Sequence, residues 1–361
     1  MIQSFNDSVT QLFTYSMIDY MRRCIELAAT AAGYTAPNPV VGAVIVCDGR
    51  IIGEGFHRQY GEPHAEVNAI RSVRDTKLLE RSTLYVNLEP CSHHGHTPPC
   101  TDFIIAHRIP YVVTGSSDPN PLVAGRGIAQ LRAAGCQVTE HVLEDECDRL
   151  NIRFMTYHRK RRPYITLKWA QTADGFIDVV RDRDIAGRPT WITGWYEQTL
   201  THKWRAEEQA VMVGANTALA DNPMLSVRRW NGHQPLRLVL DRHLRLPGSL
   251  HLFDGSRPTW VFTEQQATDT PRASYIRVPF DRQLPHHILD TLYQRRIISV
   301  LIEGGTQLLQ TFIDAGLWDE ARIFTGTACF GDGVKAPAMP AMPAEEYLCG
   351  DSRLRIVKMH L

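Results

Sequence analysis

The chain has 361 residues, of which 43% are hydrophobic and 22% are charged. This length exceeds the roughly 250–300 residues at which one hydrophobic core stops growing, so it predicts two domains, and the ordinary composition excludes a fibrous or largely disordered protein. Lys plus Arg and Asp plus Glu both total 39. The net charge therefore does not favour a polyanionic partner such as nucleic acid, and a small-molecule substrate is expected.

Two features of the sequence predict a cytoplasmic protein without membrane contact. Residues 1–17 lack the basic start and continuous apolar core of a secretory signal, and apolar runs such as VVGAVIV are far too short to cross a bilayer. The eight cysteines of so long a chain do not indicate a disulfide framework.

The first half of the chain predicts an α/β domain. We expect a helix from about Ile18 to Gly33 and then two strands, VVGAVIV and IIGEGFH, whose CDGR connection indicates an antiparallel hairpin. The strands TLYVNLEP, YVVTG and QVTEHV then alternate with helices that start near Pro63, at Cys100 and in GIAQLRAAG. Because strand–helix units favour parallel pairing, the sheet should be mixed and covered by helices.

A polar stretch from about Leu143 to Arg162 predicts a helix that leads into a linker, HRKRRP. We interpret this linker as a solvated connector rather than a phosphate site. The expected organisation is an extension over residues 1–16, a first domain over 17–160 and a second over 161–361. The second domain should contain helices in EQTLTHKWRAEE and TQLLQTFIDAG and the strands YITLKWA, AVMVGA, LRLVLD, TWVFT, IISVLIEGG and ARIFTG.

Two motifs in the first half indicate a catalytic zinc site. PHAEV sets His64 two residues before Glu66, and PCSHHGHTPPC follows with Cys91 and Cys100. A catalytic zinc takes three protein ligands and keeps one position for water, a set that the histidine and the two cysteines would satisfy. Glu66 then remains an unligated carboxylate that could move a proton from that water, as in zinc nucleobase deaminases.

Other interpretations of these residues stay open. Cys91 and Cys100 could be core thiols without a metal, and Asn38 in APNPVVG could be a turn residue or could present its amide to a substrate ring. A four-ligand structural zinc site is also possible, because any of three histidines between the cysteines could complete it: His93, His94 and His96.

The second half gives weaker signals. In LIEGGTQLLQTF, Gly305 and Thr306 lie between a strand and an amphipathic helix, which suits a bound phosphate, although a tight turn without a ligand explains the glycines about as well. VMVGANTALADNP offers a second glycine-containing loop, with Thr217 and Asp221 as ribose contacts or turn caps. No G-x-G-x-x-G dinucleotide fingerprint follows a strand in this half.

Longer segments of the first half resemble a known family. PNPVVGAVIV, HAEVNAI, LYVNLEPCSHHGHTPPC and DPNPLVAGRGIAQLRAAG are similar to the amino-terminal half of the bifunctional riboflavin-biosynthesis deaminase–reductase (RibD) family, a three-layer cytidine-deaminase-like domain. The resemblance implies zinc ligands at His64, Cys91 and Cys100, a proton-shuttling Glu66 and a substrate-facing Asn38. The implied substrate is a diaminopyrimidine that carries a phosphoribosylamino group.

The second half resembles the carboxy-terminal domain of the same family in PYITLKWAQTADGFI, WRAEEQAVMVGANTALADNPMLSVR and LIEGGTQLLQTF. The resemblance implies a dihydrofolate-reductase-like α/β fold that uses NADPH to reduce the ribosyl group to a ribityl chain. Substrate contacts are implied at Lys168, Arg205, Leu225, Arg228 and Glu303. NADPH contacts are implied at Ala170, Trp191, Thr217, Asp221, Gly305, Thr306, Gln307, Leu308, Leu309, Gln310 and Thr311. The chain departs from the family pattern in FIDVVRDRDIAGRPT, which is longer and more charged.

The expected partner is thus a small phosphoribosylated pyrimidine, with neither nucleic acid nor membrane, and a homo-oligomer is expected, with a dimer favoured because C2 dimers are the commonest assembly. Two other functions stay open: a deaminase that acts on a base in RNA, and a regulator whose zinc is structural. The balanced charge and the absence of a recognisable RNA-binding motif speak against the RNA deaminase.

Overall fold

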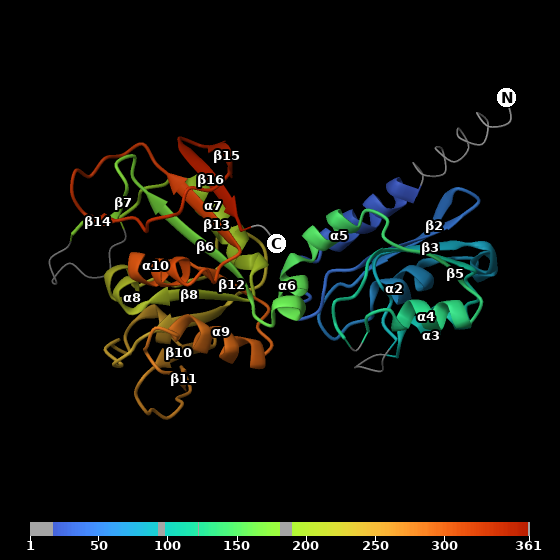
Figure 1. Ribbon diagram of the computed structural model, residues 1–361, viewed down its shortest axis with the longest axis horizontal. Helices are drawn as coiled ribbons and strands as arrows, with labels where there is room; N and C mark the ends of the chain where they lie inside the picture. Colours follow the sequence, from blue (N-terminus) through green and yellow to red (C-terminus); the bar gives the residue numbers. More distant parts are fainter. Residues whose placement is uncertain (1–16, 93–97, 122, 181–189, 360–361) are drawn as a thin grey trace. The chain divides into compact units, whose positions relative to one another are not determined.

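The computed structural model describes residues 17–92, 98–121, 123–180 and 190–359 (Figure 1). The chain divides into two compact units between Lys160 and Arg161. The extension expected over residues 1–16 lies outside the described residues. Within the described part of the chain, no helix combines the length and the apolar composition that a membrane span requires.

The first unit is built on a five-stranded sheet in the order β2-β1-β3-β4-β5. Strand β1 runs antiparallel to β2 and to β3, whereas β3, β4 and β5 run parallel. The predicted hairpin and the predicted mixed sheet are therefore confirmed. The strands are β1 (Gly42–Cys47), β2 (Arg50–Phe56), β3 (Thr83–Leu88), β4 (Tyr111–Ser116) and β5 (Gln137–Thr139).

Helices cover both faces of this sheet, because its residues point alternately to opposite sides. Ala43, Ile45 and Leu84 pack against α2, α3 and α4, whereas Val44 and Val113 pack against α5 and the helix over residues 17–29 (Figure 1). The result is a three-layer α/β/α unit. Its helices are α2 (Ala65–Ser72), α3 (Cys100–Ala106), α4 (Arg126–Ala133), α5 (Glu144–Leu150) and α6 (Ile152–Lys160), with a 3-10 helix η1 (Thr76–Arg81).

A buried carboxylate ties the end of β3 to the start of α4. Glu89 follows β3, is 3% exposed, and accepts hydrogen bonds from four backbone N–H groups. Oε1 accepts from Gly127 at 3.0 Å and from Ile128 at 3.4 Å, and Oε2 accepts from Gly125 at 3.0 Å and from Asp118 at 3.3 Å. The first N–H groups of a helix have no partner within the helix, so the carboxylate satisfies them and also interacts favourably with the helix dipole.

The second unit contains a nine-stranded sheet in the order β11-β10-β9-β8-β12-β6-β13-β16-β15. The strands from β11 to β13 run parallel, and β16 and β15 extend the sheet in antiparallel fashion. A separate pair joins β7 (Phe176–Asp178) to β14 (Val334–Lys335). The sheet strands are β6 (Tyr164–Gln171), β8 (Ala210–Gly214), β9 (Leu236–Leu240), β10 (Thr259–Thr263), β11 (Ser274–Arg277), β12 (Ser299–Ile302), β13 (Glu320–Thr325), β15 (Ala344–Cys349) and β16 (Ser352–Lys358).

Helices again cover both faces of this sheet. Leu289 of α9 and Phe312 of α10 belong to the apolar cluster on one face, and Trp204 of α7 and Ala218 of α8 belong to the cluster on the other. All six strands expected in this half form, so the predicted α/β class is confirmed. The helical elements are α7 (Trp195–Glu207), α8 (Ala215–Asp221), η2 (His251–Phe253), α9 (Leu284–Gln294) and α10 (Thr306–Asp314).

Two expectations about local structure are wrong. The segment ANTALAD is helix α8 rather than a loop, because Gly214 ends β8 and serves directly as the N-cap of the helix. The basic linker is not uniformly solvated: the Arg162 side chain is 13% exposed and forms a bidentate ion pair with Asp319, at 2.5 and 2.7 Å. A guanidinium so deeply buried requires a carboxylate partner, which β13 brings from a distant part of the sequence.

Glu89→Gln should destabilise the first unit. The amide presents one acceptor instead of two, so two of the four backbone N–H groups face a donor, and the free energy of unfolding should fall by about 3 kcal/mol. All seven tryptophans follow Arg161, so tryptophan fluorescence reports on the second unit, whereas far-UV circular dichroism reports on both. In urea, the substitution should shift the dichroism transition of the first unit and leave the fluorescence transition in place.

The matched control for this stability prediction is Glu80→Gln, which changes a carboxylate that is 59% exposed in the same unit. It should move neither transition measurably. Equal behaviour of the two variants would contradict the role given to Glu89.

Candidate active sites

Three side chains of the first unit form a group that could hold a metal ion. Nδ1 of His64 lies 3.5 Å from Sγ of Cys91 and 3.3 Å from Sγ of Cys100, and all three ligand atoms lie within 4.8 Å of one another. His64 is the N-cap of α2, and Cys100 is the first residue of α3. The fold thus brings together the three residues predicted from the sequence. His93, His94 and His96 lie outside the described residues.

The electrostatics of this group favour a cation. A hydrogen bond from Cys100 and then the His64 ring lower the pKa of Cys91 to about 4, and the backbone N–H of Cys100 also lies 3.4 Å from the Cys91 sulfur. The hydrogen bond with Cys91 and burial raise the pKa of Cys100. One imidazole and two cysteines form a donor set that suits a catalytic zinc, which would bind both sulfurs as thiolates.

Glu66 lies in the first turn of α2 and is 3% exposed. Its Oε2 atom is buried without a hydrogen-bond partner in the described part of the chain. Burial raises the pKa of the Glu66 carboxyl, and the negative charge of Cys91 adds to this effect. Buried polar atoms are nearly always paired, so an orphan oxygen beside three potential ligands fits a site that accepts water or substrate.

Asn38 is held close to the same group. Its Nδ2 atom lies 3.2 Å from Nε2 of His57, and Nδ1 of His57 lies 3.3 Å from the carbonyl oxygen of Pro63. The rings of His57 and His64 meet edge to face, with centroids 5.2 Å apart. Sequence reasoning missed His57, although its position directly after the apolar run IIGEGF was a signal for a side chain at a strand end.

Asp118 is a second residue of this region that the sequence did not single out. It lies in the DPNP segment and is 8% exposed. Burial, followed by the charges of Glu89 and Cys91, raises the pKa of Asp118 to about 7. A carboxyl group with a pKa near neutrality, close to a site of proton transfer, is a candidate functional group.

The second unit contains a cavity of about 870 Å³, near the upper end of the range for ligand pockets. It lies at the carboxyl ends of the parallel strands β6, β8, β9 and β12, the usual position of ligands in such sheets. Every residue predicted for this half except Gln310 lines it: Lys168, Ala170, Trp191, Arg205, Thr217, Asp221, Leu225, Arg228, Glu303, Gly305, Thr306, Gln307, Leu308, Leu309 and Thr311.

Gln310 lies away from the cavity. Its amide donates to Asp314 at 2.7 Å and accepts from the backbone N–H of Ala338 at 2.8 Å. These two hydrogen bonds hold the Gln310 amide against Asp314 and the backbone of Ala338.

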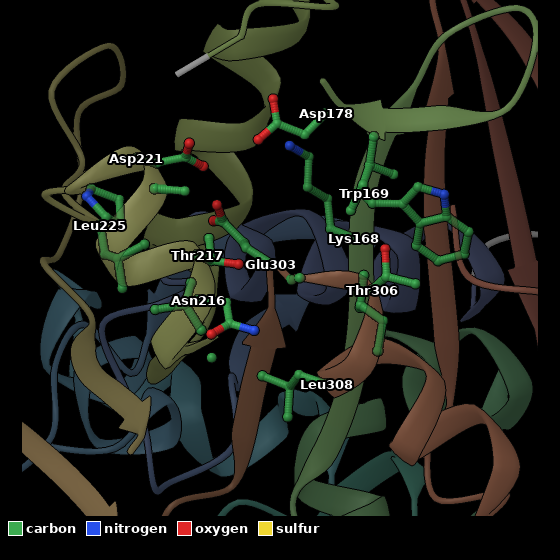
Figure 2. Close-up of a pocket in the computed structure, with 18 of the residues that line it drawn as sticks. Lys168, Trp169, Asp178, Asn216, Thr217, Asp221, Leu225, Glu303, Thr306 and Leu308 are labelled. Atoms are coloured by element: carbon green, nitrogen blue, oxygen red, sulfur yellow. The ribbon is translucent and has the colours of Figure 1, made fainter. Parts of the chain in front are cut away.

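A buried cluster of charges lies at the centre of the cavity. Strand β12 pairs with β6 so that Ile302 is opposite Leu167, which sets Glu303 beside Lys168. Figure 2 shows both side chains reaching into the cavity. Arg205 of α7 donates to both carboxylate oxygens of Glu303, at 2.5 and 2.6 Å.

The pKa values of this cluster follow from burial and pairing. Burial lowers the pKa of Lys168, and the Glu303 charge only partly opposes that shift. For Glu303, burial acts to raise the pKa, but the charge and hydrogen bonds of Arg205, followed by Lys168, hold it below its ordinary value. Lys168 is therefore an ammonium group that gives up its proton more easily than one in water.

The start of α10 forms one wall of the cavity. Gly305 is the N-cap of this helix, and a Cβ atom built on it would lie 3.0 Å from Oγ1 of Thr217. Thr306 donates its hydroxyl to the carbonyl oxygen of Lys335 at 2.6 Å. The free N–H groups of this first turn suit an anionic ligand group.

The cavity also contains residues that the sequence did not single out. His202 lines it from α7, one helical turn before Arg205, a spacing that could have found it. Asn216, Arg242 and Arg245 line another part, and Nη2 of Arg245 lies 3.3 Å from Oδ1 of Asn216. Arg242 follows the carboxyl end of β9, which was the available signal for this residue.

Two family models match the chain. Residues 15–116 match the cytidine and deoxycytidylate deaminase zinc-binding region. Residues 163–358 match the RibD C-terminal domain. The first match contains the His64 group, and the second contains the described lining of the cavity.

Curated relatives and solved structures agree with these matches. The chain is 40% identical over 328 residues to the riboflavin biosynthesis protein RibD of Actinobacillus pleuropneumoniae, covering 88% of this chain and 85% of the relative. It is 39% identical over 335 residues to RibD of Aquifex aeolicus, covering 91% and 92%.

Among solved structures, a diaminohydroxyphosphoribosylaminopyrimidine deaminase/5-amino-6-(5-phosphoribosylamino)uracil reductase from Thermotoga maritima superposes with a TM-score of 0.87 at 39% identity, over 96% of this chain and 99% of that one. RibD of Acinetobacter baumannii gives a TM-score of 0.85 at 32% identity. The chain therefore belongs to the RibD family of riboflavin biosynthesis enzymes, with a zinc-binding deaminase in its first half and a reductase in its second.

Proposed function

We propose that the chain acts twice on one pyrimidine nucleotide. The first unit removes an amino group from a diaminopyrimidine that carries a phosphoribosylamino group, and the second reduces the ribosyl group of the product to a ribityl chain. The reactions named for the Thermotoga maritima relative support this choice of substrates. The observation that carries the first reaction is the orphan Oε2 atom of Glu66 beside the ligand group.

His64, Cys91 and Cys100 would hold the zinc ion. When bound, zinc lowers the pKa of a water ligand to about 7 and so supplies hydroxide for attack on the ring carbon. Glu66 would accept one proton of the attacking water and deliver it to the ring nitrogen, and would then move the second proton from the new hydroxyl group to the leaving amine. Water adds to the ring carbon, the bond to the amino group breaks, and ammonia leaves. The raised pKa of Glu66 suits a carboxyl group that must accept and release a proton.

Asn38 is assigned to the substrate in the first unit. Its amide is already engaged with His57 at 3.2 Å, which fixes the plane of the side chain. A fixed amide beside the metal group can donate to or accept from the edge of a pyrimidine, and so can set the ring against the attacking water.

In the second unit, Lys168, Arg205, Leu225, Arg228 and Glu303 are assigned to the substrate. NADPH supplies a hydride for C1′ of the ribosyl group, and the ring oxygen released from C1′ takes up one proton. Lys168 is the donor that the electrostatics favour, because burial lowers the pKa of its ammonium group. The other predicted residues that line the cavity are assigned to the cofactor: Ala170, Trp191, Thr217, Asp221, Gly305, Thr306, Gln307, Leu308, Leu309 and Thr311.

The organisation proposed for the chain is an extension over residues 1–16, a deaminase domain over 17–160 and a reductase domain over 161–361. We further propose that the protein works in the cytoplasm as a homodimer. The eight free cysteines support a reducing compartment. Two-fold symmetry is the commonest arrangement of soluble oligomers.

Glu66→Gln should abolish deamination without loss of zinc. The amide keeps the shape of the side chain but cannot accept the proton of water, so ammonia release should fall by about a hundredfold or more. Ammonia release is measured with the diaminopyrimidine nucleotide in the absence of NADPH, and the zinc content of the same sample is measured by mass spectrometry. The surface variant Glu80→Gln should release ammonia at the wild-type rate. Full ammonia release by Glu66→Gln would rule out this carboxylate as the proton carrier.

Lys168→Met should remove the second activity and spare the first. Methionine fills a similar volume without the ammonium group, so oxidation of NADPH by the deaminated substrate should slow by about a hundredfold, while ammonia release stays unchanged. The rate of NADPH oxidation is measured from the decrease in NADPH absorbance. Lys203→Met, on the exposed side of α7, is the matched control. A wild-type rate of NADPH oxidation in Lys168→Met would rule out Lys168 as the proton donor.

A further inference from the structure

Helix α7 is joined to the segment 225–228 by a histidine. His202 is 4% exposed and lines the cavity. Its Nδ1 atom accepts a hydrogen bond from the backbone N–H of Arg228 at 3.2 Å. The imidazole therefore binds the backbone of Arg228.

Two further hydrogen bonds lie between helix α7 and the segment 225–228 or within that segment. Arg205, one turn after His202 on α7, donates from Nη1 to the carbonyl oxygen of Ser226 at 3.1 Å. Arg228 donates from Nη1 to the hydroxyl oxygen of Ser226 at 3.2 Å. Both guanidinium groups thus contact Ser226, and His202 binds the backbone N–H of Arg228.

The two arginines differ in their charge balance. Arg205 is neutralised by Glu303, in a pair whose side chains are 12% and 9% exposed. Arg228 forms no ion pair with a carboxylate among the described residues, and burial, together with the charges of Arg205 and Arg229, lowers its pKa. A cation held in this way is stabilised when an anion binds beside it. A phosphate group of the substrate is such an anion, and Arg is the side chain best suited to bind it.

His202 must be neutral in this arrangement. An imidazole nitrogen that accepts an N–H hydrogen bond carries no proton, so the ring proton lies on Nε2. Burial, followed by the charges of Arg205 and Arg228, lowers the pKa of His202 to about 4. The ring can therefore lie against two cations without adding a third charge to the phosphate site.

We infer that His202 is a positioning residue for substrate phosphate, because its Nδ1 acceptor holds the Arg228 peptide at the distance from α7 at which both guanidinium groups reach one phosphate. This inference rests on the proposed function, in which Arg205 and Arg228 bind the phosphorylated substrate. It predicts that the acceptor affects binding of the phosphate and not the transfer of hydride. A change at His202 should therefore raise KM and leave kcat nearly unchanged.

Two conservative substitutions test whether the hydrogen-bond acceptor at the position of Nδ1, rather than the size of the side chain, is what matters. The amide of His202→Asn offers an oxygen at about the position of Nδ1, whereas the amide of His202→Gln moves it to about the position of Nε2. Reduction is measured with the deaminated nucleotide and with its dephosphorylated counterpart. We expect His202→Gln to raise KM for the nucleotide about tenfold, a loss of roughly 1.4 kcal/mol, with kcat within about twofold. His202→Asn should remain near the wild-type KM.

For the dephosphorylated compound, all three proteins should have the same KM. The control is Thr199→Val on the same helix, whose hydroxyl donates to the carbonyl oxygen of Trp195 within α7. It should leave both KM values unchanged. Ammonia release by the first unit checks that each variant is folded and active there.

Three outcomes would overturn the inference. Equal rises of KM for both compounds would mean that His202 merely supports the fold of the cavity. A wild-type KM in His202→Gln would mean that the position of the acceptor does not affect binding. A rise of KM in His202→Asn as large as that in His202→Gln would mean the same. If the wild-type protein itself bound both compounds equally well, the assignment of phosphate to Arg205 and Arg228 would fail first, and the role of His202 with it.

Discussion

The chemistry of the first unit depends on one constraint, the meeting of three ligand atoms within 4.8 Å of one another. The residues that supply them lie 27 and 36 positions apart in the chain, counted from His64. Two helices begin at this point, and β3 ends just before Cys91. The carboxylate of Glu89 ties that strand end to α4, which fixes the chain just before Cys91.

The second unit also brings its reactive groups together from distant parts of the chain, but it uses strand register and an ion pair. It must keep an ammonium group and a carboxylate out of water, close enough to react with a substrate. The register of β6 and β12 sets Lys168 beside Glu303, and Arg205 pairs with the carboxylate. A buried charge without a partner would cost several kcal/mol, so the pairing with Arg205 stabilises the ionised carboxylate of Glu303. In both units the reactive groups lie where helices begin or parallel strands end, because unpaired backbone dipoles are concentrated there.

Most of the fold could be predicted because apolar residues recur along the chain at the spacing typical of strands and helices. The hairpin of β1 and β2 was evident from two apolar runs and a turn, and the parallel strands of the second unit are continuous apolar segments. Strand β15 was missed because Ala344 to Leu348 are all exposed and carry no such signal. The three residues that could hold a metal ion were predicted from motif spacing. His57 and His202 have only weak local signals, and nothing in the sequence indicates their contacts with Asn38 and Arg228, which lie 19 and 26 positions away.

The coordination of zinc is the most direct test of the account, and X-ray absorption at the zinc edge of the purified full-length protein measures it. We expect one zinc ion per chain, surrounded by two sulfur atoms at about 2.3 Å, one imidazole nitrogen at about 2.0 Å and one oxygen from water. A shell with a second imidazole in place of the oxygen would mean a closed structural site. A shell without two sulfurs would mean that Cys91 and Cys100 do not bind the ion together, and either result would contradict the proposed deaminase mechanism.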